Sequence, residues 1–120
     1  MIQSSSEYQQ ELRHAMRGGN GDVRFEHIWK PEEDMHSLNR LYSKIILNPG
    51  CSIGYHIHEN EEEIFFILQG NASADDNGVK KNLKTGDSMI TRSGEGHSIA
   101  CSGNEPLVIL AVISCYPRPS

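Results

Sequence analysis

Apolar and polar residues alternate along most of this chain, which predicts short β-strands. Residues 23–29 carry Phe25, His27 and Trp29 on one face, and Pro31 follows them closely. Similar segments lie between Gly-, Pro- and Asn-rich turns, among them the hairpin signal Asp75-Asp76-Asn77-Gly78. We expect about eight or nine strands in an all-β sandwich or barrel. The clearest further strands are 41–47, 64–68, 71–75, 79–84 and 107–114.

The two ends of the chain depart from this alternation. Tyr8, Leu12 and Met16 fall near one face at helical spacing after the potential cap Ser6, which predicts a short amphipathic helix. Residues 107–114 are almost continuously apolar, which predicts a strand buried on both faces. We therefore divide the chain into an N-terminal helix and Gly-rich linker (1–22), a β-domain (23–116) and a tail (117–120), as one domain overall.

Candidate metal ligands occur where two expected strands meet. His56 and His58 share one face of an extended chain, because successive side chains point to opposite sides. Glu63 follows the turn-like residues 60–62, and it would lie level with both histidines if the two strands pair antiparallel. Two imidazoles and a carboxylate are nitrogen and oxygen donors suited to a divalent metal. Glu61 and Glu62 are alternatives to Glu63 as the carboxylate ligand, but Glu62 should face away, and the remaining acids are expected to form a solvated rim.

A fourth donor, His97, opens a later strand after the turn 93–96. With it, the chain resembles the cupin superfamily, whose two motifs are G-x5-H-x-H-x(3,4)-E-x6-G and G-x5-P-x-G-x2-H-x3-N. The first is matched by Gly50, His56, His58, Glu63 and Gly70, and the second by Gly86, Gly94 and His97. Arg92 stands where the family usually has Pro, and Cys101 where it usually has Asn.

The resemblance covers about residues 40–115 and implies a double-stranded β-helix, a small jelly-roll barrel with a metal inside. His56, His58, Glu63 and His97 would be the ligands, with about two positions of an octahedral ion left open. Fe, Mn, Ni, Co, Cu and Zn all accept this donor set. The expected function is action on a small organic molecule by dioxygenase, isomerase or decarboxylase chemistry, which leaves open whether the protein is an oxidoreductase. The alternative is a binding or sensing module without turnover.

A small-molecule pocket is expected beside the metal. On the period-2 count Phe65, Ile67 and Gln69 face inward with Glu63. Arg92 either points to solvent or reaches an anionic substrate at the barrel mouth. Cys101 should face inward with Ile99, as a small buried hydrophobe or else as a redox-sensitive group or accessory ligand. The predicted pocket residues are Phe65, Ile67, Gln69, Arg92, Ile99 and Cys101.

The composition limits which classes of partner and which cellular compartment are expected. The 120 residues carry a formal net charge of −5 without a basic block, which disfavours nucleic acid and anionic membranes as partners. No apolar run approaches the roughly 18 residues of a membrane span, and no secretion signal is recognisable. Three widely spaced cysteines without a CxxC pair favour the reducing cytoplasm. Ile64, Phe66 and Leu68 should face outward together with Trp29, which predicts a homodimer.

Overall fold

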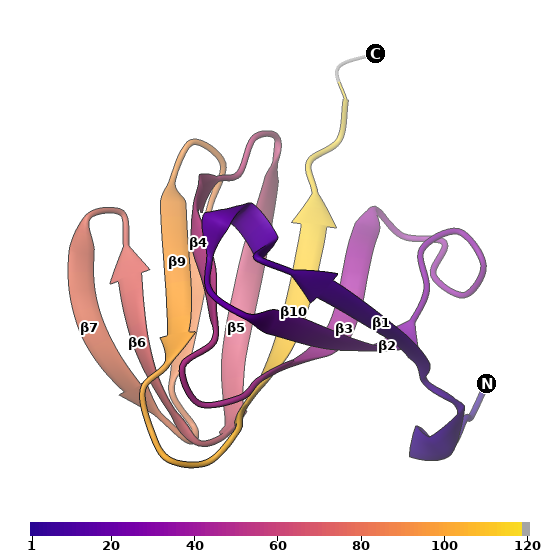
Figure 1. The fold of residues 1–120 in the computed structure, drawn as a ribbon. Helices are drawn as coiled ribbons and strands as arrows, with labels where there is room; N and C mark the ends of the chain where they lie inside the picture. The colour runs from indigo at the N-terminus through magenta and orange to yellow at the C-terminus, as the bar shows by residue number, and fades with distance from the viewer. Residues whose placement is uncertain (119–120) are drawn as a thin grey trace.

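Two antiparallel β-sheets face each other in the computed structural model, which describes residues 1–118 (Figure 1). The larger sheet has six strands, in the order β1 (Gln9–His14), β2 (Asp22–Trp29), β3 (Asn39–Leu47), β10 (Leu107–Cys115), β5 (Glu61–Gln69) and β8 (Ser88–Thr91). The smaller has four, in the order β4 (Ser52–Ile57), β9 (Gly96–Cys101), β6 (Asn71–Asp76) and β7 (Val79–Lys84). The predicted all-β double-stranded β-helix is confirmed.

The space between the sheets is filled by the inward-facing side chains, which alternate with outward-facing ones along each strand. Phe25, Ile45, Phe65 and Ile109 are each at most 2% exposed. Alternation also holds in β10, whose residues are in turn buried and half-buried, so the expectation that this strand is buried on both faces is wrong. One face of β10 packs in the barrel, while the other lies on the outer side of the larger sheet.

The predicted N-terminal helix is also wrong. The segment contains a 3-10 turn, η1 (Ser5–Glu7), then strand β1, then a second 3-10 turn, η2 (Met16–Gly18). β1 pairs antiparallel with β2 and becomes the edge strand of the larger sheet, so its backbone groups that face β2 are hydrogen-bonded in an extended conformation. The apolar positions that suggested a helix are not buried together, since Leu12 is 64% exposed. Within residues 1–118 no helix is long and apolar enough to cross a membrane.

Strands β4 and β5 follow one another in the chain but belong to different sheets. β4 pairs with β9, whereas β5 pairs with β10 and β8. The expected direct pairing of the histidine strand with the glutamate strand is therefore wrong. Instead, their side chains meet across the interior of the barrel, which sets the geometry of the site described next.

Candidate metal centre

The four predicted donors meet between the two sheets. His56 on β4 lies opposite His97 on β9, and His58 follows β4 directly. The backbone of His58 is held by the turn before β9, donating to the carbonyl of Glu95 (3.1 Å) and accepting from the amide of Gly94 (2.7 Å). Glu63 approaches from β5 in the opposite sheet.

The donor atoms of this group converge on one point. The Nε2 atom of His97 lies 3.1 Å from that of His58 and 3.2 Å from that of His56. Glu63 Oε1 lies 3.1 Å from His58 Nε2 and 3.2 Å from His97 Nε2. All four ligand atoms lie within 4.8 Å of one another. Adjacent ligand atoms on an octahedral ion with bonds of about 2.1 Å are about 3.0 Å apart, so these spacings suit a divalent metal.

The other ring nitrogen of each histidine has a partner on the outer side of the group. His56 Nδ1 is 2.8 Å from the carbonyl oxygen of Gly54, and His58 Nδ1 is 2.6 Å from Glu61 Oε2. Both partners only accept, so each Nδ1 carries a proton, and in the neutral form of each ring the Nε2 lone pair points inward. His97 Nδ1 lies 2.7 Å from Thr91 Oγ1.

Burial makes this cluster of lone pairs unfavourable without a cation. His58, Glu63 and His97 are only 4%, 4% and 1% exposed. The hydrogen bond to Glu63 raises the pKa of His58, with a further contribution from Glu61. Burial alone would raise the pKa of Glu63, but hydrogen bonds to His58 and His97 hold it below its ordinary value. Burial lowers the pKa of His56. A divalent ion would satisfy all four donors at once.

Glu61 has a role that the sequence reasoning missed, because it was considered only as a turn residue or as a substitute ligand for Glu63. Strand β5 begins at Glu61, whose side chain is only 13% exposed. Its carboxylate accepts two hydrogen bonds from Arg40, both 2.6 Å long, as well as the one from His58. The Arg40 guanidinium is the main reason that the pKa of Glu61 is lowered. The period-2 count from Glu63 was a usable signal, because it places Glu61 on the same inward face.

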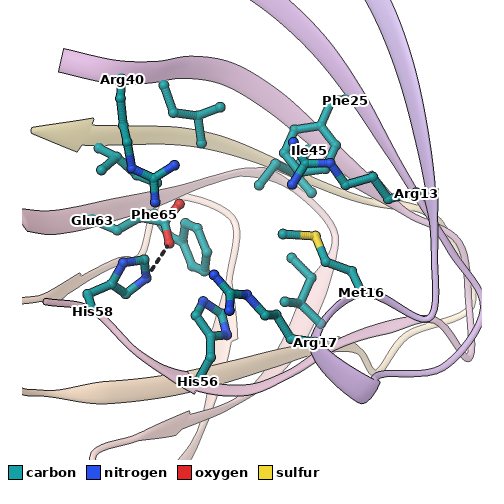
Figure 2. Close-up of a pocket in the computed structure, with 13 residues that line it drawn as sticks. Arg13, Met16, Arg17, Phe25, Arg40, Ile45, His56, His58, Glu63 and Phe65 are labelled. Atoms are coloured by element: carbon teal, nitrogen blue, oxygen red, sulfur yellow. Dashed lines mark ion pairs between the residues drawn. The ribbon is translucent and has the colours of Figure 1, made fainter.

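Beside the four donors is a small pocket of about 70 Å³ (Figure 2). Its walls combine charged and imidazole groups with apolar side chains, among them Phe25, Ile45 and Phe65. The Phe65 ring stacks on the His97 imidazole, with centroids 4.9 Å apart. Three guanidinium groups complete the lining, those of Arg13, Arg17 and Arg40. The sequence reasoning missed them, two because they were assigned to the helix that does not form.

The other predicted pocket residues lie elsewhere. Ile67, Ile99 and Cys101 are buried in the hydrophobic core and do not line the pocket. The Cys101 thiol donates to the carbonyl of Glu105 (3.2 Å). Arg92 pairs with Glu95 with 64% of its side chain exposed, which matches the solvent alternative.

Gln69 is exposed, so its predicted inward orientation is wrong. The register between β5 and β10 shifts beside it: Val108 is opposite Gln69, while Ile109 is opposite Ile67. Such an irregularity interrupts the alternation on which the prediction depended.

Comparison with known proteins agrees with this geometry. Residues 43–113 match the family model of the cupin domain. A protein of Thermotoga maritima named oxalate-binding protein is 45% identical over 113 residues, or 94% of this chain and 93% of that protein. A crystal structure from T. maritima, described as a predicted oxalate decarboxylase, has a TM-score of 0.90 and 44% identity over 96% of this chain and 99% of that chain.

More distant structures share the fold alone. A polyketide cyclase from Streptomyces resistomycificus is 15% identical, with a TM-score of 0.78 over 100% of this chain and 82% of that chain.

Proposed function

This chain belongs to the cupin family, and from that premise we propose that it binds a small dicarboxylate such as oxalate through a divalent metal. The metal would be held by His56, His58, Glu63 and His97. The observation that carries the proposal is the convergence of three imidazole nitrogens and one carboxylate oxygen beside a pocket. When bound, the metal would supply a Lewis-acidic positive charge for a ligand oxygen.

The pocket supports a small anionic ligand. Its volume of about 70 Å³ has room for only a few heavy atoms, far less than the roughly 300 Å³ and more of a typical drug-sized site. Guanidinium groups in the lining favour carboxylates, which they bind through charge-assisted hydrogen bonds. The relative named oxalate-binding protein, which this chain matches over almost its whole length, supports the same ligand class.

We favour binding over turnover because, within residues 1–118, no separate proton-transfer group lines the pocket. Apart from the donors His56, His58 and Glu63, its lining residues are apolar or arginines, and arginine stays protonated near neutral pH. Decarboxylation is the second candidate, supported by the solved relative described as a predicted oxalate decarboxylase. Dioxygenase and isomerase chemistry have no comparable support. The native metal stays open among Fe, Mn, Ni, Co, Cu and Zn, and the cytoplasmic location stays a prediction.

We also propose a homodimer formed through the outer face of the larger sheet. Ile64, Phe66 and Leu68 on β5 and Ile90 on β8 are each between 38% and 43% exposed. Ile64 is paired with Ile90, and β10 adds half-buried apolar side chains beside β5, so the exposed surface is a continuous apolar stripe. A second copy would cover it by presenting the same stripe.

The proposed function is tested by measuring metal content and oxalate binding together. Untagged protein purified without chelator should carry about one transition metal ion per chain, and the His56→Ala/His58→Ala variant should carry none. Calorimetry should then detect oxalate binding only to the metal-loaded wild-type protein. Formate and carbon dioxide released from oxalate would favour the decarboxylase alternative. Loaded protein that does not bind oxalate would contradict both.

A further inference from the structure

Among the three arginines of the pocket, Arg17 has no carboxylate partner within residues 1–118. Arg13 pairs with Glu11 at 2.9 Å and lies over the Phe25 ring, and Arg40 is engaged by Glu61. Figure 2 shows the Arg17 side chain reaching into the pocket beside His56, facing the metal-binding group. Its charge is therefore available to a ligand that lies on the metal.

Arg17 lies in a turn that backbone hydrogen bonds and core packing hold in place. Arg17 lies in η2 with φ +55°, a left-handed conformation that is unfavourable for a residue with a Cβ atom. Hydrogen bonds close the turn on both sides, from the Gly18 amide to the Ala15 carbonyl (3.0 Å) and from the Gly19 amide to the Met16 carbonyl (3.0 Å). Met16 packs against the core, which anchors the turn.

The turn is also fastened to β4, the strand that carries His56. The Ser52 amide donates to the Asn20 carbonyl at 2.8 Å. Gly54 packs directly on the backbone of Arg17, so that a Cβ atom added there would overlap the Arg17 carbonyl oxygen. The position of Arg17 relative to the metal-binding group is thus determined by direct backbone packing (Figure 1).

Charge balance indicates what Arg17 is for. The pairs Arg13–Glu11 and Arg40–Glu61 are each neutral, and the histidines that bind a metal are neutral. A divalent ion opposed only by Glu63 leaves one positive charge, and Arg17 adds a second. A ligand with two negative charges would neutralise the pocket, whereas a monoanion would leave one positive charge without a partner.

We propose that Arg17 is the specificity-determining residue of the site and selects dianionic over monoanionic ligands. It pairs with the carboxylate charge that the metal centre leaves uncompensated. The inference rests on the proposed metal-dependent binding of a dicarboxylate and names the residue that recognises the second carboxylate.

The test compares oxalate with glycolate, a two-carbon acid in which an alcohol replaces one carboxylate. Calorimetry on metal-loaded Arg17→Asn should show oxalate binding weakened roughly 10- to 100-fold, the loss of one charge-assisted hydrogen-bonding pair. Glycolate binding should change much less, so the preference for oxalate falls. Asn suits the left-handed backbone of this turn, which protects the fold, and Arg17→Lys should recover part of the preference.

Arg92→Asn is the matched control, since it removes the same charge outside the pocket and should leave the preference unchanged. Metal content should be unchanged in all three variants. A preference for oxalate that stays within about threefold of wild type in Arg17→Asn would overturn the inference, as would equal loss of both acids. Wild-type protein that carries metal and binds neither acid would overturn the proposed function itself, and this inference with it.

Discussion

Each imidazole of the metal centre is held by a different hydrogen-bonding partner at Nδ1: a backbone carbonyl for His56, a carboxylate for His58 and a hydroxyl for His97. The carboxylate of Glu61 is the most consequential, because it also binds Arg40 on the other side. The hydrogen-bonded series Arg40–Glu61–His58 therefore orients the imidazole of His58, a metal ligand, and also increases its basicity.

Replacing Glu61 by Gln should weaken metal binding roughly 10- to 100-fold, the usual effect of removing an outer partner of a ligating histidine. The amide can still accept the proton of His58 Nδ1 but lacks the charge that polarises the ring. The dissociation constant of the metal, measured by competition with a coloured chelator, checks this.

Glu59→Gln is the control for Glu61→Gln, because Glu59 is an exposed acid two residues away in the loop before β5. The Glu59→Gln protein should bind the metal with the same affinity as the wild-type protein. Equal affinities in both variants would show that Glu61 does not support the centre.

At the scale of elements, the close approach of η2 to β4 depends on two residues without side chains. A Cβ atom on Gly19 would overlap the Ser52 carbonyl oxygen, and one on Gly54 would overlap that of Arg17. In both cases the overlap is with backbone atoms, which cannot move away as the end of a flexible side chain can. The glycine cluster that the sequence suggests is a linker is thus part of the packing that brings Arg17 to the pocket.

Gly54→Ala should force the two segments apart. We expect it to lower the free energy of unfolding by roughly 1–3 kcal/mol, the usual cost of overpacking, and to weaken oxalate binding because Arg17 moves. Urea denaturation of the metal-free protein measures the first effect and calorimetry the second.

For Gly103→Ala, the new methyl group would meet only the Asn71 side chain at 3.3 Å, so little loss of stability is expected. A Gly54→Ala protein as stable as the Gly103→Ala protein would contradict the packing argument.

At the scale of the whole molecule, the exposed apolar side chains on the larger sheet bear on whether two copies associate. The apolar stripe of Ile64, Phe66, Leu68 and Ile90 covers the outer face of the larger sheet around β5. If two copies bury this stripe, light scattering of the wild-type protein at micromolar concentration should give a molar mass of twice the 13.4 kDa chain mass.

Phe66→Glu should convert that dimer to a monomer, because it places a charge in the centre of the apolar contact. Val79→Glu is the control, since Val79 is an apolar residue 58% exposed on β7 of the other sheet. A wild-type monomer, or a Phe66→Glu dimer, would show that this face is not the interface.

The sequence by itself determined the all-β class, most strands and the four candidate ligands. These depend on short-range rules: alternation decides the face that a side chain takes, and the motif spacing puts His56, His58, Glu63 and His97 at strand ends. Tertiary structure decided which strands became neighbours. Glu63 reaches the histidines from the opposite sheet, Gln69 turns outward at a register shift, and residues 9–14 pair with an edge strand instead of forming a helix. Arg17 enters the pocket for the same reason. Long-range pairing and backbone packing depend on segments far apart in the chain, which local periodicity does not record.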